Sequence, residues 1–140
     1  MSTGAATFQQ ELAGQNVYLA ARYSHRVDLL IKASELKAEG HEVVSRWISG
    51  FQEGHPDDEC AIADEEDVRR ADILVFFSEG AEMGDRGGGG RHVEFGIAYA
   101  LGKTIIVVGH PENLFHSLPG IIVAADWSEA IQAIRRVKDA

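Results

Sequence analysis

Two apolar runs decide the fold class of this chain: Ile73–Phe77 reads ILVFF and Thr104–Val108 reads TIIVV. Both have the length of a strand and consist mainly of the β-branched and aromatic residues that favour strands. Their apolar residues follow one another without alternation, which is typical of strands buried on both faces of a parallel sheet. The two runs therefore predict a sheet that is covered by helices on both sides.

Strand and helix patterns alternate along the rest of the chain. Gly40 and Gly102 mark the expected ends of two helices, and Ser24 and Ser128 are expected N-caps. This alternation predicts a three-layer α/β fold with a parallel sheet of about five strands. We expect strands over 17–21, 42–46, 72–77, 104–108 and 120–124, and helices over 25–39, 60–70, 91–101 and 128–138. The expected apolar stripes are Val27, Leu30, Ile31 and Leu36 in the first helix, and Val93, Ile97, Ala98 and Leu101 in the third.

The length and composition are those of one globular domain. The chain has 140 residues, of which 45% are hydrophobic and 25% are charged. Residues 1–15 are small and polar and are expected to form a loosely ordered leader before a single domain over 16–140. No apolar run approaches the roughly 20 residues that span a bilayer. Cys60 is the only cysteine, so an internal disulfide is impossible, and we expect a reducing, cytoplasmic location.

Charge and motifs exclude several classes of partner. A net charge of −9 argues against a surface for duplex nucleic acid, although a small anionic ligand in a local basic pocket fits. The histidines lack metal-ligand spacing, so we expect no metal. A Walker A loop and a dinucleotide fingerprint are both missing, and we expect no cofactor.

Ligands of such folds bind at the carboxyl ends of the strands, where two loops stand out. In the first, Arg22 and Ser24 precede an expected helix and would form an anion site, although a capping serine beside solvated arginines explains this segment better when it is taken alone. In the second, Gly87–Gly90 precedes Arg91 and would let the backbone approach a ligand closely, or would simply be flexible. Glu94 follows one turn into that helix, as either a dipole partner or a functional carboxylate at the pocket mouth.

These segments together resemble the nucleoside 2-deoxyribosyltransferase superfamily. The resemblance rests on Val17–Ala21, on Asp64 upstream of Ala71-Asp72, and on the stretch Gly89–Lys103, which contains Glu-x-Gly-x-x-x-Ala-x-Gly-Lys. It runs from about residue 16 to about residue 108, and only the last motif is fairly specific. Ser45-Arg46-Trp47 and Pro111–His116 extend it towards a branch that is common in bacteria and phages.

The resemblance implies a flavodoxin-like (Rossmann-like) fold and a covalent mechanism. In this superfamily the glutamate that matches Glu94 attacks the anomeric carbon of the sugar, the base leaves, and another base or water resolves the glycosyl ester. The tyrosine matching Tyr18 positions that carboxylate, and the aspartate matching Asp64 handles the nucleobase. The superfamily includes base-exchanging transferases and deoxynucleoside 5′-monophosphate N-glycosidases, and its members form homodimers or larger homo-oligomers.

One departure bears on the substrate. Transferases carry an aspartate for the sugar 5′-hydroxyl six residues before the nucleophile, and the monophosphate glycosidases carry serine there, near the phosphate. Gly88 takes that place here. We therefore expect the amides of Gly88, Gly89 and Gly90 to hold a 5′-phosphate, together with the side chains of Arg91, Arg22 and Ser24.

Further residues have two interpretations each. Trp47 either stacks on the base or fills an interface, and the role of His92 is open. Asn113 and His116 lie on a loop that related enzymes bring near a neighbouring subunit's site, and a structural turn before Pro119 explains them equally well.

We expect cleavage or transfer at the N-glycosidic bond of a (deoxy)nucleoside or its 5′-monophosphate. Two alternatives stay open. One is a nucleotide-binding or regulatory module without turnover. The other is an NAD glycohydrolase, because the related TIR domains also cleave an N-glycosidic bond with a glutamate.

Overall fold

The computed structural model describes residues 14–79 and 89–137, and within them five parallel strands form one sheet. The strand order is β2-β1-β3-β4-β5, and every neighbouring pair is parallel. This order is that of flavodoxin-like folds, so the predicted fold class is confirmed. The strands are β1 (Asn16–Ala20), β2 (Glu42–Val43), β3 (Ile73–Phe77), β4 (Thr104–Val108) and β5 (Ile122–Ala124).

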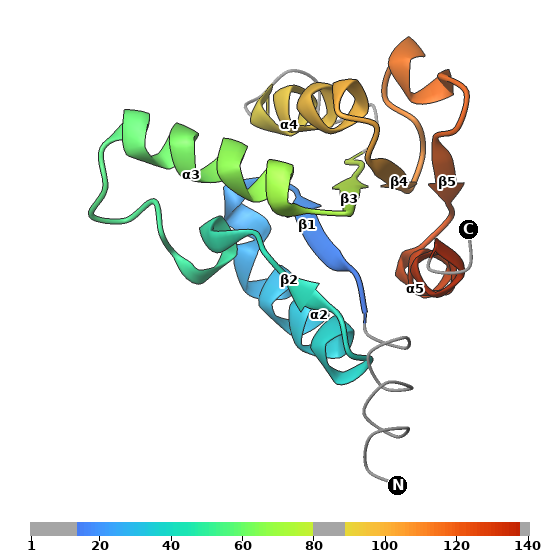
Figure 1. Cartoon of the computed structure of the whole chain (residues 1–140), viewed down its shortest axis with the longest axis horizontal. Helices are drawn as coiled ribbons and strands as arrows, with labels where there is room; N and C mark the ends of the chain where they lie inside the picture. Colours follow the sequence, from blue (N-terminus) through green and yellow to red (C-terminus); the bar gives the residue numbers. More distant parts are fainter. Residues whose placement is uncertain (1–13, 80–88, 138–140) are drawn as a thin grey trace, which may run out of the picture.

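Helices cover both faces of the sheet. Figure 1 shows α3 and α4 together on one face and α2 and α5 on the other. None of the helices within residues 14–79 and 89–137 has the length and apolar character needed to cross a membrane. The α-helices are α2 (Arg26–Ala38), α3 (Asp57–Arg70), α4 (Gly89–Ala100) and α5 (Trp127–Val137), and the 3₁₀ turns are η1 (Tyr23–His25), η2 (Arg46–Ser49) and η4 (Leu114–Ser117).

The core lies along the three central strands. All residues from Val17 to Ala20 and from Ile73 to Phe76 are fully buried, and Ile105–Val107 are at most 1% exposed. Tyr18 of β1 pairs with Leu74 of β3, so a tyrosine hydroxyl lies inside this apolar layer. The unbroken apolar runs of the sequence thus correspond to strands that are covered on both faces, as predicted.

Several element boundaries differ from those expected. Ser24 lies inside η1 and caps no helix, because α2 begins only at Arg26 without a side-chain cap. Asp126, rather than Ser128, caps α5, since its Oδ1 accepts the Glu129 N–H at 2.9 Å. Strand β2 stops at Val43 because the chain turns into η2. Helix α3 starts three residues early, at Asp57, where three acidic residues favour a helix N-terminus.

The predicted apolar stripes were partly wrong. On α2 the buried residues are Leu29 and Leu36, whereas Val27 and Ile31 are 64% and 61% exposed. On α4 the buried positions are Arg91, Phe95 and Ala98, and Val93 is 63% exposed. The predicted stripes of Leu30 with Ile31 and of Val93 with Leu101 therefore do not form the core faces, because both helices are rotated about their axes relative to the expected phase.

The expected leader lies mostly outside the described residues. Its last two residues, Gly14 and Gln15, already contact the folded chain. The Gly14 N–H donates to the Gly40 carbonyl at 3.2 Å, and the Gln15 N–H donates to Nδ1 of His41 at 3.0 Å.

Asp67 is a fully buried carboxylate that joins α3 to η2. It accepts the backbone N–H of Arg46 at 2.9 Å and the Nε–H of the same arginine at 3.0 Å. Arg70 adds a third donor at 3.3 Å. This cluster holds the segment that carries Trp47 against the helix that carries Asp64.

Asp67→Ala should destabilise the fold by about 2 kcal/mol, because it removes a fully buried carboxylate that accepts hydrogen bonds from a backbone N–H and from two partly exposed arginines. Glu66→Ala is the matched control, since Glu66 pairs with the same Arg46 at 2.9 Å but from the exposed side. That variant should lose about 0.5 kcal/mol or less. Urea denaturation measures both, and equal losses would contradict the assigned role of Asp67.

Candidate active site

A hydrogen bond between Tyr18 and Glu94 lies at the centre of the candidate site. The Tyr18 hydroxyl donates to Oε2 of Glu94 at 2.5 Å. Tyr18 is fully buried on β1, and Glu94 lies on α4, 76 positions later in the chain. Because side chains alternate along a strand, Tyr18 faces the α4 side of the sheet while Leu19 faces the opposite side.

Glu94 and Asp64 line one cavity of about 160 Å³ at the carboxyl ends of the strands. Four segments that are distant in the sequence build its wall. Tyr18 lies behind Glu94. The lining residues are Ala21, Arg22 and Tyr23 after β1, Trp47 and Gln52 after β2, Asp64 on α3, and Gly90, Arg91 and Glu94 on α4. The three residues predicted to be catalytic thus lie together at the expected edge of the sheet.

Burial raises the pKa of both carboxyl groups in this cavity. Burial is the main cause that raises the pKa of Glu94 to about 8; the charge of Asp64 adds to it, while the Tyr18 hydrogen bond and the charge of Arg91 oppose it. Burial also raises the pKa of Asp64 to about 6, with the charge of Asp67 adding to it and that of Arg46 opposing it. The pKa of Tyr18 lies well above its ordinary value because of burial and the two nearby carboxylates. Two acids with separated pKa values on either side of neutrality can share acid and nucleophile roles.

The two arginines predicted to bind an anion line the cavity, but each also pairs with an acid. Arg22 contacts the buried carboxylate of Glu79. Arg91 is 4% exposed, and its Nη1 and Nη2 donate to the two carboxylate oxygens of Glu112 at 2.7 and 3.1 Å. The Glu79 N–H donates to Glu112 at 2.9 Å, which joins the two pairs. The alternative interpretation of the first loop, with solvated arginines, does not apply to Arg22, whose side chain is 14% exposed.

The remaining residues of the predicted phosphate site lie in different places. Gly90 lines the cavity, whereas Gly89 is exposed at the start of α4 and Gly88 lies outside the described residues. Ser24 is exposed and is not part of the lining. The structure thus brings Arg22, Gly90 and Arg91 together and leaves Ser24 aside.

Trp47 is buried and contributes to the wall. Its Nε1–H donates to the Leu19 carbonyl at 2.8 Å, which fixes the indole, and its ring lies 6.2 Å from that of Tyr23. Only 3% of Trp47 is exposed, so Tyr23 offers the more accessible ring for a base.

His92, Asn113 and His116 lie beside the site. Asn113 caps η4 by accepting the Phe115 N–H at 2.9 Å, and its amide lies 3.4 Å from Nδ1 of His92. His116 is 2% exposed, packs against Phe76, and accepts the Glu112 N–H at 3.0 Å. Within this one chain, the contacts of Asn113 and His116 fit one of their two interpretations, a structural turn before Pro119. None of these three residues is part of the cavity wall.

Four residues of the site escaped the sequence interpretation. Tyr23 and Gln52 line the cavity, and Glu79 and Glu112 hold the arginines. Both glutamates follow the buried strands β3 and β4, so their position at the carboxyl edge was a usable signal. Among the residues that the structure describes, no group of three or more His, Cys, Asp or Glu side chains could hold a metal ion.

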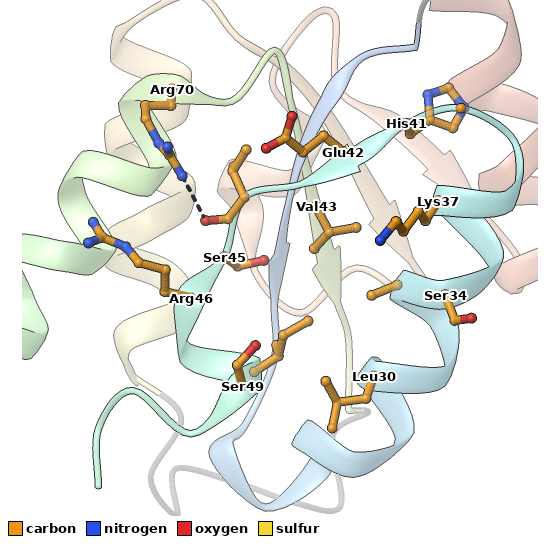
Figure 2. A pocket seen from close by; sticks show the side chains of 14 residues that line it. Leu30, Ser34, Lys37, His41, Glu42, Val43, Ser45, Arg46, Ser49 and Arg70 are labelled. Atoms are coloured by element: carbon orange, nitrogen blue, oxygen red, sulfur yellow. Dashed lines mark hydrogen bonds between the residues drawn. The ribbon is translucent and has the colours of Figure 1, made fainter. Parts of the chain in front are cut away.

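A larger hollow of about 880 Å³ lies beside the edge strand β2 and helix α2 (Figure 2). Its lining includes Ser34, Lys37, Glu42 and Arg70, and Arg70 donates to the Val44 carbonyl at 3.3 Å. Among the described residues that line it, Glu42 is the only carboxylate, and it is exposed. We therefore assign the chemistry to the smaller cavity.

The raised pKa of Glu94 predicts a pH-dependent effect on stability. Between the ordinary value of 4.5 and about 8, folded Glu94 keeps a proton that the unfolded chain releases, so the free energy of unfolding falls as pH rises. Glutamine at this position cannot ionise. The Tm of Glu94→Gln, relative to wild type, should therefore rise steadily across this window in thermal melts. Glu53→Gln changes an exposed glutamate and is the control. A Tm difference for Glu94→Gln that stays constant with pH would contradict the buried, neutral carboxyl.

Comparison with known proteins identifies solved structures of similar architecture. Neither a model of a known protein family nor a curated protein matches the sequence. The structure of the Clostridium botulinum CMP N-glycosidase BcmB matches with a TM-score of 0.56 and 25% sequence identity, over 85% of this chain and 97% of that one. BcmB is a member of the nucleoside 2-deoxyribosyltransferase-like superfamily. The resemblance to this superfamily that the sequence motifs predicted is thus confirmed by the structure.

Proposed function

We propose that this chain cleaves the N-glycosidic bond of a nucleoside 5′-monophosphate, through a covalent glycosyl ester on Glu94. The observation that carries the proposal is the Glu94 carboxyl group, held by Tyr18 and lining a cavity together with Asp64. The structural likeness to a CMP N-glycosidase supports the same class of bond and substrate.

The chemistry follows from the two carboxyl groups. Ionised Glu94 attacks the anomeric carbon, a C–O bond forms, and the C–N bond breaks with its electron pair going to the base. The leaving base takes a proton, for which neutral Asp64 is the nearby donor in the cavity. Water then attacks the anomeric carbon, its proton goes to the Asp64 carboxylate, and the C–O bond to Glu94 breaks and releases Glu94 as a carboxylate. Two displacements retain the configuration of the sugar and divide the barrier.

Tyr18 orients the nucleophile. Its hydroxyl donates to Oε2 of Glu94, and this hydrogen bond favours the ionised form of the carboxylate against the effect of burial. Because Tyr18 is part of the core, the carboxylate is fixed relative to β1 before substrate enters.

A phosphate group would lie near Arg22 and the N-terminal end of α4. Arg22 lines the cavity, and Gly90 lies at the N-terminal end of α4, where the helix dipole favours an anion. Arg91 also lines the cavity and adds a positive charge, although Glu112 holds both ends of its guanidinium. This arrangement favours a 5′-monophosphate over an uncharged nucleoside. If a second base instead of water attacks the glycosyl ester, the same intermediate leads to base transfer. The proposal also includes a homo-oligomer, in which two copies of the chain form an interface.

The direct assay is a panel of nucleosides, ribo- and deoxyribonucleoside 5′-monophosphates and NAD, read by chromatography for free base. We expect base release from a monophosphate by the wild type and none by Glu94→Gln. Release of nicotinamide alone would favour an NAD glycohydrolase. A rise in Tm with nucleotide, without release of any base, would favour a binding module.

The pH profile of kcat/KM should be bell-shaped, with its limbs at about 6 and about 8. Activity requires ionised Glu94 and protonated Asp64 in the same molecule. The fraction of enzyme in this state rises with pH up to about 6, is highest between about 6 and about 8, and falls above about 8. Asp64→Asn removes the second requirement and also the charge that helps to raise the pKa of Glu94, so its profile should rise at a pH below about 8 and lack the falling limb. A falling limb that persists in Asp64→Asn would exclude Asp64 as the proton donor.

Arg22→Ala should weaken the binding of a 5′-monophosphate more than the binding of the matching nucleoside. Each charged hydrogen bond contributes about 1.5–3 kcal/mol, so KM for the nucleotide should rise by at least about tenfold, with kcat less affected. Arg26→Ala is a suitable control, because Arg26 follows in the same segment but does not line the cavity. Equal losses for nucleotide and nucleoside would indicate that Arg22 does not contact the phosphate.

A further inference from the structure

Arg91 and Glu94 lie three positions apart on α4 and both line the cavity. Side chains at positions i and i+3 of a helix are neighbours, so the guanidinium has the carboxylate within reach. No ion pair between these two residues is present in the described part of the chain. Such a pair would occupy the carboxylate that we assign as the nucleophile and would hinder its approach to the anomeric carbon.

The other partners of Arg91 explain why this pair does not form. Its Nη1–H donates to Oε2 of Glu112 at 2.7 Å and to the Phe77 carbonyl at 2.9 Å, and its Nη2–H donates to Oε1 of Glu112 at 3.1 Å. The guanidinium also lies over the Phe76 ring, 4.8 Å from its centre. The fork of the arginine is therefore turned towards the ends of β3 and β4.

Glu112 is itself held in place. Its Oε2 accepts the Glu79 N–H at 2.9 Å, and its own N–H donates to Nδ1 of His116 at 3.0 Å. Burial would raise the pKa of Glu112, but the hydrogen bonds from Arg91 and Glu79 outweigh it, and the pKa lies below its ordinary value. Glu112 thus stays ionised and does not line the cavity.

We propose that Glu112 is a positioning residue, which engages the Arg91 fork and so keeps that guanidinium from closing onto Glu94. Glu112 then acts on the reaction only through Arg91. The proposal rests on the function proposed above, in which Glu94 is the nucleophile. The diverted arginine leaves Glu94 with Tyr18 as its hydrogen-bond donor and leaves the carboxylate accessible to the sugar.

The charges around the two glutamates give the effect a defined sign. Glu94 faces Tyr18 from β1, Asp64 from α3 and Arg91 from its own helix, and Arg91 is the one positive charge among them. Glu112 faces Arg91, and Nε2 of His92 lies 3.6 Å from its Oε1. Loss of the Glu112 carboxylate removes the two shortest carboxylate contacts of the Arg91 fork, at 2.7 and 3.1 Å, whereas Oε1 of Glu79 lies farther away, at 3.7 Å from Nη2. A fork that then turns towards Glu94 lowers the pKa of Glu94.

The test is a ¹³C NMR titration of the glutamate carboxyl carbons, in which the Glu94 signal is identified by its absence from Glu94→Gln. In Glu112→Gln we expect the pKa of Glu94 to fall from about 8 by about 1 to 3 pH units. Base release should also be lost, because the Arg91 guanidinium then occupies the carboxylate that attacks the sugar. Arg91→Met should raise the pKa of Glu94, and the double variant Glu112→Gln/Arg91→Met should match Arg91→Met alone.

Glu39→Gln is the matched control, because Glu39 holds Arg135 through two hydrogen bonds, of 2.9 and 2.6 Å, outside the cavity. It should leave the pKa of Glu94 and base release unchanged. If Glu112→Gln does not fold, Glu112→Asp withdraws the carboxylate from the fork and should shift the pKa of Glu94 in the same direction.

An unchanged or raised pKa of Glu94 in the folded Glu112 variants would overturn the proposal, as would the same downward shift in the absence of Arg91. Failure of the proposed function is a separate result, since the titration requires no substrate. In that case the pKa of Glu94 would still fall in Glu112→Gln, while Glu94→Gln would retain base release.

Discussion

The hydrogen bond from the Tyr18 hydroxyl to Glu94 is the constraint on which the rest of the site depends. It joins the first strand to α4 across 76 positions of sequence, inside a layer that is otherwise apolar. A polar pair of this kind is tolerated only where both partners are satisfied, so the packing of α4 against β1 must be accurate. The sheet places β1 next to β3, where the strand order reverses, and ligands of such folds bind there.

At Glu94, the ionised carboxylate that the reaction needs is the form that lowers the stability of the fold. Burial keeps Glu94 neutral up to about pH 8, and each ionised nucleophile therefore forms at a cost to the folded state. The surrounding charges reduce that cost in a graded way. Tyr18 and Arg91 favour the carboxylate, while Asp64 opposes it, and Glu112 limits how closely Arg91 approaches. The balance leaves one carboxyl group poised on each side of neutrality.

The sequence predicted those features of the fold and the site that short stretches of residues determine. The apolar runs at 73–77 and 104–108 identified buried parallel strands, and the helix motif around Glu94 identified the carboxylate that faces the cavity. Ser24 failed as a cap and Val93 as a core residue, because the phase of a helix is set by tertiary contacts such as Phe95 against Phe76. The Glu79 and Glu112 pairs with the arginines were missed because each joins residues more than 20 positions apart, and no periodicity encodes such pairs.

The central claim is that Glu94 bonds covalently to the sugar, and intact-protein and peptide mass spectrometry test it most directly. The wild type would be incubated with a slowly reacting 2′-fluorinated analogue of the nucleoside 5′-monophosphate that the substrate panel identifies, and quenched in acid. The account predicts release of the base together with a fluorinated sugar-phosphate adduct on the peptide that contains Glu94, and neither product with Glu94→Gln. An adduct on any other residue, or base release at the full rate with Glu94 unmodified throughout, would contradict it.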